Sequence, residues 1–442
     1  MAPARSRSIE AQPARSIRGR FTLPGDKSIS HRSIMLSALA DGVSEIRGFL
    51  ASEDCLATLK AMRALGVRIE QIGATEVRVH GAGLHGLKQA AHALDMGNAG
   101  TAIRLFTGLL AAQPFDSRLI GDESLMRRPM ERVARPLREM GARVATHDGT
   151  PPVEVSGGQR LHGIDYRMPV ASAQVKSAIL LAALYAEGRT RVASPAVCRD
   201  HSERMLIAAG VPITTQGLAI TLEPPMRLVS QNLEVPGDFS SAAFFIVAGL
   251  LGAPEQGLVL QNVGLNPTRI GLLDILRSMG GRIEVEGARM SGAEPVGDLR
   301  IRPSALKGVE VPPALVALAI DEFPVLFVAA ACAEGETVVT GAEELRVKES
   351  DRIAAMSAGL SVLGVEHSVT PDGMRIRGRA DGPAFGGGEI DSRGDHRVAM
   401  AFSMAALKAR KPILVRDTAN IATSFPGFLE LARAAGLDLV ER

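Results

Sequence analysis

The 442-residue chain is longer than a single hydrophobic core usually supports, so we expect two domains of about 200 residues each. Apolar residues make up 46% and charged residues 22%, as in soluble globular proteins, and a net charge of +2 gives no reason to expect nucleic acid or an anionic membrane as a partner. Aromatic residues reach only 3%, without tryptophan, which also argues against a surface for stacking bases.

The first twenty residues hold five arginines and a single acid, without the apolar stretch of a secretory signal. We expect a flexible tail that leads into a first strand just before Leu23. The longest uncharged run, residues 239–254, is too short for a membrane span. The cysteines at positions 55, 198 and 332 show no paired spacing, so we expect no disulfide framework and no metal site, and a cytoplasmic location.

The segment GDKSISHR at residues 25–32 opens an apolar helix pattern. Free backbone N–H groups and the positive end of the helix dipole favour an anion at such a start. Ser28 and Arg32 share one helix face, as Lys27 and His31 do. A phosphate or carboxylate would therefore meet cations, a hydroxyl and backbone donors together. A capped helix with a solvated basic turn is the alternative for one such segment.

The same mixture of glycine, hydroxyl, amide and cationic residues recurs at later helix starts. It occurs at residues 97–104 (GNAGTAIR), 127–130 (RRPM), 172–177 (SAQVKS), 199–203 (RDHSE), 348–352 (KESDR) and 395–397 (DHR). A single arginine is most often a surface ion-pair partner. So many cationic helix starts in a nearly neutral chain indicate a ligand with several negative charges. The run DHSE at residues 200–203 resembles ligand or triad material but has no matching partners in the sequence.

Carboxylates occupy comparable positions. Asp321 and Glu322 interrupt an apolar run at residues 314–331, where a solvated charge is out of character. Burial or a neighbouring acid would raise the pKa of such a carboxyl group and suit it to proton transfer. Glu349 lies three residues before Arg352 on the same helix face. A plain helix-start carboxylate is the alternative for Glu349.

A helix–glycine–strand signature repeats along the chain. Its glycines are Gly66, Gly141, Gly210, Gly280, Gly364 and Gly436, at spacings of 75, 69, 70, 84 and 72 residues. Glycine is the residue that a helix needs to end in a left-handed cap, so the spacing predicts six α/β units. The sequence PGDKS at residues 24–28 is echoed by PGDFS at residues 236–240, which groups the units three and three. The first strand then belongs with the C-terminal half.

Ten motifs, in order between residues 23 and 428, resemble the 5-enolpyruvylshikimate-3-phosphate synthase family. They are LPGDKSISHR, GNAGTAIR, RRPM, SAQVKSA, RDHSE, NPTR, DEFP, LRVKESDR, GDHRVAMAF and ATSFPGF. The resemblance implies a mixed α/β fold, a two-domain inside-out α/β barrel of six βαβαββ units with three in each domain. It implies one domain of residues 24–236, a second of residues 1–23 plus 237–442, and an active site in the cleft between them.

The resemblance also implies the reaction of phosphoenolpyruvate with shikimate 3-phosphate to give the enolpyruvyl ether and phosphate. It proceeds by addition and elimination, without metal or organic cofactor, in aromatic amino-acid biosynthesis. The resemblance implies a cytoplasmic enzyme that glyphosate can inhibit, and we expect a monomer.

The family's functional residues carry over by position. Those expected to hold shikimate 3-phosphate are Ser28, Arg32, Ser172, Gln174, Arg199 and Lys348. Those expected to hold phosphoenolpyruvate are Lys27, Gly100, Arg128, Gln174, Arg352 and Arg397, and Asn98, Ala173 and Asp321 complete the substrate-binding set. Asp321 would take the proton from the attacking 5-hydroxyl. Glu349, with Lys27, would handle protons at the enolpyruvyl carbon and the leaving phosphate, with His396 beside them.

Some positions depart from the commonest family pattern. Thr423 stands where many members have lysine, and Glu344 where many have asparagine. Several motifs resemble the second class of the family, which often tolerates glyphosate, although Gly100 is retained where some tolerant members carry alanine. The alternatives are the sister enzyme acting on UDP-N-acetylglucosamine, whose usual cysteine is missing from residues 121–127, and a non-catalytic relative that binds phosphorylated metabolites.

Overall fold

The computed structural model describes residues 7–442. Backbone proximity divides the chain into two compact units. Unit 1 contains residues 7–24, Gly237–Arg289 and Pro295–Arg442, and unit 2 contains Gly25–Pro236 together with Met290–Glu294. The last segment, the tip of a hairpin, is not part of the N-terminal half in the domain boundaries predicted from the sequence.

One supersecondary pattern repeats within both units, as β6 (Leu94–Asp95) to β9 illustrate. The buried helix α3 (Gly100–Leu110) connects β6 to the parallel strand β7 (Ser117–Ile120). After α4 (Glu131–Glu139), the strands β8 (Arg143–His147) and β9 (Thr150–Ser156) form a hairpin that adds to β7 in antiparallel fashion. A parallel pair needs a long crossover and an antiparallel pair only a short turn, and here the crossover is a helix.

The other elements of unit 2 follow the same pattern. They are α1 (Lys27–Leu39), β3 (Ala40–Arg47), α2 (Glu53–Ala64), β4 (Arg68–Gln71), β5 (Glu76–Ala82), η1 (Leu125–Arg127), β10 (Asp165–Arg167), α5 (Ala173–Ala183), β11 (Thr190–Ala193), α6 (His201–Ala208), β12 (Ile213–Gln216), β13 (Ala219–Leu222), β14 (Leu228–Val229) and β15 (Leu233–Glu234). Its sheets have the orders β14-β3-β5-β4, with β15 also on β3, β6-β7-β9-β8 and β10-β11-β13-β12.

Unit 1 contains the remaining elements. They are β1 (Ile9–Ala11), β2 (Arg20–Thr22), α7 (Phe239–Gly252), β16 (Leu258–Gly264), α8 (Gly271–Ser278), β17 (Arg282–Ser291), β18 (Glu294–Arg302), α9 (Pro313–Val316), α10 (Phe323–Ala331), β19 (Gly335–Val339), η2 (Glu343–Val347), α11 (Arg352–Val362), β20 (His367–Thr370), β21 (Gly373–Gly378), β22 (Gly388–Asp391), α12 (His396–Ala405), η3 (Ala406–Lys408), β23 (Ile413–Arg416), η4 (Ala419–Thr423), α13 (Phe428–Ala435) and β24 (Leu439–Glu441). Its sheets have the orders β17-β18-β16-β2, β19-β21-β20 and β22-β23-β1-β24.

The glycines of the repeated signature cap the second helix of each repeat. Their φ angles are 90° at Gly66, 98° at Gly141, 88° at Gly210, 93° at Gly280, 75° at Gly364 and 114° at Gly436. These left-handed conformations follow α2, α4, α6, α8, α11 and α13. Within the described residues the strands form six sheets, so the six-unit architecture predicted from the sequence is confirmed.

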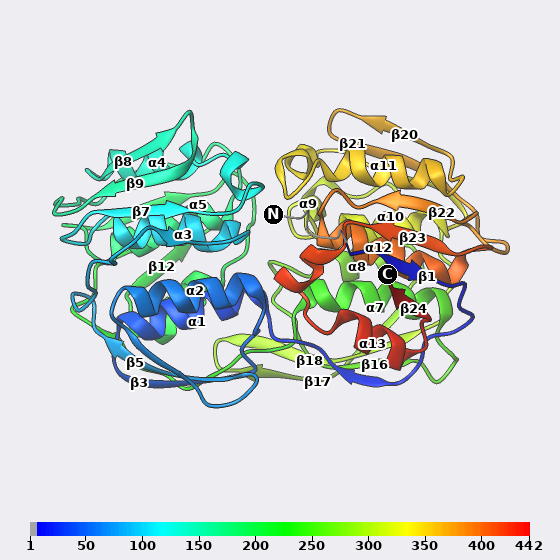
Figure 1. Cartoon of the computed structure of the whole chain (residues 1–442), viewed down its shortest axis with the longest axis horizontal. Coiled ribbons are helices and arrows are strands. Elements are labelled where there is room, and N and C mark those ends of the chain that lie inside the picture. Colours follow the sequence, from blue (N-terminus) through cyan, green and yellow to red (C-terminus); the bar gives the residue numbers. More distant parts are fainter. Residues whose placement is uncertain (1–6) are drawn as a thin grey trace. The chain divides into compact units, whose positions relative to one another are not determined.

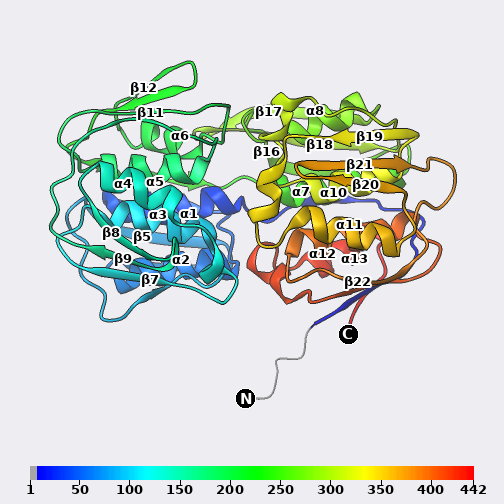
Figure 2. The same cartoon turned by 90° about the horizontal axis from the view of Figure 1, so that it is seen from above.

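Helices form the interior of each unit and sheets form its outside (Figures 1 and 2). In α1, α5, α7 and α12 nearly every residue is buried, because these helices are surrounded by other helices and by the inner faces of the sheets. Strands such as β9 alternate buried and exposed residues, so only one face of each sheet is covered. The buried helices are therefore the core of each unit.

The duplicated PGD sequence forms equivalent turns at residues 24–26 and 236–238. Asp26 caps α1 by accepting the Ile29 N–H at 2.8 Å, and Asp238 caps α7 by accepting the Ser241 N–H at 3.1 Å. The Asp26 N–H donates to the carbonyl of Pro236, and the Asp238 N–H donates to that of Pro24. The two crossover segments are thus fixed by reciprocal backbone hydrogen bonds.

The prediction of a flexible N-terminal tail is wrong for the described residues, which begin at residue 7. β1 lies between β23 and β24, pairing antiparallel with both, and β2 pairs in parallel with β16. The last repeat, at the C-terminal end of the chain, lacks a final strand of its own, and β1 occupies that place. Burial of Ile9 and Ala11 in the core stabilises this insertion. Residues 1–6 lie outside the described residues.

None of the helices in residues 7–442 combines the length and apolarity that a bilayer crossing requires. Cys55, Cys198 and Cys332 are free thiols, and the first and last of them are buried. Burial raises the pKa of Cys332 to about 12, which keeps this thiol protonated near neutral pH.

Candidate functional site

The starts of α1, α3 and α5 meet within unit 2. The Gln174 amide donates to Thr101 Oγ1 at 3.0 Å, which joins the start of α5 to that of α3, and its carbonyl oxygen accepts from Arg104. Arg32 of α1 donates to Ser177 of α5 at 2.8 Å. Three helix starts in one place combine their N–H groups and dipoles, which favours an anion there.

Lys27, the first residue of α1, is held by a carboxylate of α2. Its Nζ lies 2.9 Å from Asp54 Oδ2, and the lysine side chain is 18% exposed. One turn further into α1, His31 is buried with Nδ1 2.7 Å from Thr58 Oγ1. Burial, with the charges of Lys27 and Arg32, lowers the pKa of His31 well below its ordinary value. The imidazole is therefore neutral support for the helix start.

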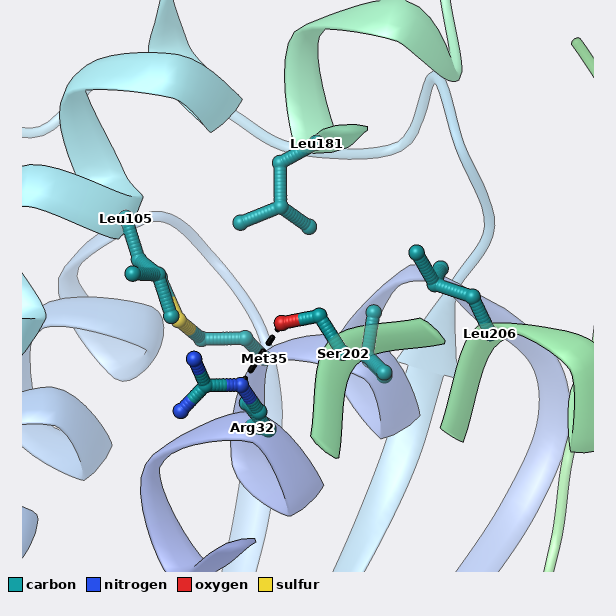
Figure 3. A pocket seen from close by; sticks show the side chains of 7 residues that line it. Arg32, Met35, Leu105, Leu181, Ser202 and Leu206 are labelled. Atoms are coloured by element: carbon teal, nitrogen blue, oxygen red, sulfur yellow. Dashed lines mark hydrogen bonds between the residues drawn. The ribbon is translucent and has the colours of Figure 1, made fainter. Parts of the chain in front are cut away.

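Arg32 is almost completely buried and fixed by neutral oxygen atoms. It donates to Ser202 at 2.7 Å, to Ser177 at 2.8 Å and to the Ser28 carbonyl at 2.9 Å. Figure 3 shows the guanidinium turned toward Ser202, beside a cavity of about 10 Å³ lined by apolar side chains. That volume is too small for a substrate. Burial lowers the pKa of Arg32 to about 10, although Glu203 opposes the shift, so the guanidinium stays charged.

Asn98, Gly100 and Arg128 form a second group at the start of α3. Arg128 donates to Asn98 Oδ1 at 2.6 Å and to Ser124 Oγ at 3.3 Å, and Asn98 donates to Asp122 at 2.7 Å. A Cβ atom at Gly100 would lie 2.8 Å from Arg128 Nη1. Glycine therefore allows the guanidinium to approach the backbone of the helix start.

The predicted residues of the third repeat also lie at helix starts. Ser172 caps α5 by accepting the Val175 N–H at 3.4 Å, and Ala173 is the first residue of that helix. Arg199, partly buried, precedes α6 and lies near enough to Arg32 to affect its pKa. The starts predicted from sequence thus gather Lys27, Ser28, Arg32, Asn98, Gly100, Arg128, Ser172, Ala173, Gln174 and Arg199 within unit 2.

Residues 201–203, part of the run that resembled ligand or triad material, each have a buried partner. His201 Nδ1 lies 2.7 Å from Glu294 Oε1, Ser202 accepts from Arg32, and Glu203 pairs with Lys176. The sequence could not indicate these contacts, because the partners come from distant parts of the chain. These contacts make residues 201–203 structural partners of Arg32 and Lys176.

The starts of α7, α10 and α12 meet in the same way within unit 1. Ser240 near the start of α7 donates to the carboxylate of Glu322, the residue that precedes α10. Arg397 of α12 donates to the Asp321 carbonyl at 3.1 Å and lies 3.8 Å from Glu322 Oε1. The acids in the apolar run therefore lie between α9 and α10, at a helix start.

Arg352 organises the carboxylates of unit 1. Its guanidinium donates to Glu349 at 2.6 Å, to Asp395 at 2.9 Å and to Asp321 at 3.3 Å. Burial alone would lower the pKa of Arg352, but the three carboxylates outweigh burial and raise it above its ordinary value. The guanidinium is 1% exposed, whereas the side chains of Asp321 and Glu349 are 16% and 20% exposed. Arg352 therefore fixes two carboxylates that remain accessible.

The other predicted residues of unit 1 surround this group. Lys348 Nζ lies 3.6 Å from Asp321 Oδ1, and His396 is buried as the first residue of α12. Thr423, at the position where many family members have lysine, is buried in η4 and donates to the Asn420 carbonyl at 2.7 Å. Unit 1 thus gathers Asp321, Lys348, Glu349, Arg352, His396 and Arg397.

Sequence reasoning missed Asp54 and the structural role of Asp395. Asp54 follows the N-cap Ser52 of α2, a position that predicts only a helix start. Asp395 caps α12 and also accepts from Ser350 and Arg352. The motif DHR contained a detectable signal, because an aspartate before a helix is a typical N-cap.

Comparison with known sequences gives full-length matches. The profile of the family described as EPSP synthase (3-phosphoshikimate 1-carboxyvinyltransferase) matches residues 11–431. A 3-phosphoshikimate 1-carboxyvinyltransferase of Methylococcus capsulatus is 57% identical over 430 residues, which cover 97% of both chains. One of Alkalilimnicola ehrlichii is 58% identical over 432 residues, covering 98% of this chain and 96% of the relative.

Solved structures give the same result. An EPSP synthase structure from Acinetobacter baumannii has a TM-score of 0.88 at 52% identity and covers 99% of this chain and 100% of its own. The enolpyruvyl transferase NikO from Streptomyces tendae has a TM-score of 0.80 at 18% identity, with 99% of both chains covered, a likeness of fold alone.

Proposed function

The chain belongs to the EPSP synthase family, and from this premise we propose that the helix starts of its two units form one active site. The activity of the family is the transfer of the enolpyruvyl group of phosphoenolpyruvate to the 5-hydroxyl of shikimate 3-phosphate with release of phosphate. This chain is a transferase with that activity, in the shikimate pathway to aromatic amino acids. What we propose beyond it is the role of individual residues.

One observation supports the assignment above the others. Unit 2 gathers cations, hydroxyls and amides at the starts of α1, α3 and α5, and unit 1 gathers carboxylates around Arg352. Both substrates carry a phosphate and a carboxylate, so the enzyme has to neutralise several negative charges. Proton transfer then needs carboxylates near the reacting atoms. Each unit contributes groups to this requirement, which supports a site that uses residues of both.

For shikimate 3-phosphate, the proposed binding residues are Ser28, Arg32, Ser172, Gln174, Arg199 and Lys348. Arg32 uses three N–H groups on protein oxygens, and a guanidinium has five donors. Donors therefore remain on Arg32 for a substrate oxygen. The caps of α1 and α5 fix Ser28 and Ser172 relative to the backbone N–H groups of their helices. Asn98 and Ala173 complete this binding surface.

For phosphoenolpyruvate, the proposed residues are Lys27, Gly100, Arg128, Gln174, Arg352 and Arg397. Lys27 and Arg128 are already oriented by Asp54 and Asn98, so little side-chain entropy is lost when the anion binds. Glyphosate carries a phosphonate and a carboxylate, and we propose that it binds to the same residues. Glycine at position 100 lets the Arg128 guanidinium keep its place for either anion, so any tolerance of glyphosate in this chain comes from other residues.

The proposed chemistry is addition followed by elimination. Asp321 accepts the proton of the 5-hydroxyl of shikimate 3-phosphate as the hydroxyl oxygen bonds to the central carbon of phosphoenolpyruvate. Glu349 with Lys27 delivers a proton to the methylene carbon. The methyl group then loses a proton, the double bond reforms and phosphate leaves. Glu349 with Lys27 also accepts the proton that the methyl group loses and protonates the leaving phosphate. His396 assists from the start of α12. Arg352 holds Asp321 and Glu349 in place for both steps.

The protein is further proposed to be a cytoplasmic monomer that needs neither a nucleic acid nor a membrane. The free cysteines and the small net charge support this proposal. Sedimentation of the purified protein tests the oligomeric state.

The direct test of function is phosphate release from phosphoenolpyruvate with shikimate 3-phosphate as acceptor. UDP-N-acetylglucosamine as acceptor tests the sister activity, and glyphosate tests inhibition. We expect rapid release only with shikimate 3-phosphate. Binding of both substrates without release would instead indicate a non-catalytic relative.

A further inference from the structure

The first turn of α6 carries a buried polar cluster that the proposed reaction does not use. Its consecutive residues His201, Ser202 and Glu203 are at most 5% exposed, and each contacts a buried side chain from a different element. Buried polar groups are costly unless they are paired. An arrangement of this kind therefore fixes the start of α6, which directly follows the partly buried Arg199.

Lys176 connects this cluster to α5. It lies two residues after Gln174 and is 6% exposed. Its Nζ pairs with the carboxylate of Glu203 and donates to the carbonyl oxygen of Cys198 at 3.4 Å. Burial alone would lower the pKa of Lys176, but Glu203 and Cys198 outweigh burial and raise it. The side chain thus remains an ammonium donor.

The carbonyl that Lys176 holds belongs to the peptide group joining Cys198 to Arg199. Residues 194–200, between β11 and α6, form neither helix nor strand, so no ladder of backbone hydrogen bonds sets their path. On the other side of Arg199, the carboxylate of Asp200 accepts from Arg204 Nε at 2.9 Å. Lys176 therefore holds the backbone just before Arg199, and Arg204 holds the side chain of the residue just after it.

We propose that Lys176, held by Glu203, is a positioning residue that sets the backbone at residues 198–200 so that Arg199 meets the phosphate of shikimate 3-phosphate. The inference rests on the proposed role of Arg199. Lys176 acts through Arg199 and does not itself contact the substrate. A displacement of an ångström at a binding group can cost up to about a hundredfold in rate or affinity.

The test is a double-mutant cycle of Lys176→Met and Arg199→Ala. We expect Lys176→Met to raise the KM for shikimate 3-phosphate by about tenfold, the order of one charge-assisted hydrogen bond, with kcat and the KM for phosphoenolpyruvate changed by less than about threefold. In the Arg199→Ala background, Lys176→Met should add little, because the residue it positions is gone. Equal effects in both backgrounds would overturn the proposal.

Removing Lys176 alone leaves Glu203 buried without its partner and can prevent folding. The variant Lys176→Met/Glu203→Met removes both charges and keeps an apolar interior, so the cycle is also run with this pair. Its KM for shikimate 3-phosphate should rise as in the single variant while its unfolding midpoint stays near that of the wild type. A normal KM in the folded double variant contradicts a positioning role.

Tyr185→Phe is the matched control, because it removes the buried hydroxyl of a partly buried residue just beyond the other end of α5. It should leave both KM values unchanged. Phosphate release by the wild-type protein distinguishes a failure of the Lys176 proposal from a failure of the proposed function. If the wild type releases phosphate and the cycle is additive, only the role of Lys176 is wrong; if it releases none, the proposed function is wrong.

Discussion

The two units begin their buried helices in the same way but hold their cations differently. In unit 2, Arg32 and Arg128 donate to serine, asparagine and backbone oxygens. In unit 1, Arg352 donates to three carboxylates. A guanidinium fixed by neutral oxygens keeps its positive charge for a ligand, whereas a guanidinium among carboxylates mainly fixes the carboxylates. This difference supports the proposal that unit 2 supplies most of the anion-binding groups and unit 1 supplies the carboxylates for proton transfer.

The comparison is tested most severely at Arg352. Arg352→Met leaves buried carboxylates without their cation, so we expect the free energy of unfolding to fall by about 3–5 kcal/mol and turnover to be lost. Urea unfolding and phosphate release measure the two effects. Arg375→Met is the control, since its partner Glu336 is also exposed and their ion pair contributes little. An unchanged unfolding midpoint in Arg352→Met would show that the carboxylates do not depend on this residue.

Asp321 tests the proton-transfer half of the comparison. Asp321→Asn keeps the size of the side chain but removes the base, so kcat should fall on the order of a hundredfold or more. Binding of shikimate 3-phosphate, measured by calorimetry, should change little. Glu343→Gln, an exposed acid of η2, is the control and should behave as the wild type. Full turnover in Asp321→Asn would remove this residue from the mechanism.

Gly100 tests the anion-binding half. In Gly100→Ala the new methyl group lies 2.8 Å from Arg128 Nη1 and must displace the guanidinium. We expect a rise of about tenfold in the KM for phosphoenolpyruvate and weaker inhibition by glyphosate, with the KM for shikimate 3-phosphate nearly unchanged. Gly73→Ala is the control, because its Cβ meets Glu76 at ordinary contact distances. If the KM for phosphoenolpyruvate stays constant, Arg128 is not positioned as proposed.

The smallest expected effect concerns His31 and the dependence of the free energy of unfolding on pH. Its folded-state pKa is lowered by burial, then by Lys27 and Arg32, so below the ordinary value of 6.5 the unfolded chain binds a proton that the folded chain does not. Stability is therefore complete above pH 6.5 and falls by about 1.4 kcal/mol per pH unit below it. His31→Asn should remove this part of the loss in urea unfolding between pH 7.5 and 5.5. Parallel curves for both proteins would contradict a neutral His31.

The glycine spacing and the helix-start motifs predicted the six repeats, because a left-handed cap and an N-terminal anion site each depend on local sequence. Asp54, Glu203 and Glu294 could not be predicted as partners of Lys27, Lys176 and His201, since packing of distant segments decides those pairs. β1 could not be predicted for the same reason. Its basic neighbourhood suggested a tail, whereas its buried Ile9 and Ala11 are explained only by the sheet it joins.

The position of β1 bears on the order in which the chain acquires its structure during synthesis. β1 leaves the ribosome long before its neighbours β23 (Ile413–Arg416) and β24 (Leu439–Glu441). Unit 2 can therefore complete its sheets while unit 1 still lacks β23 and β24. A protease or chaperone that meets the nascent chain would find a finished first half beside an unfinished second half.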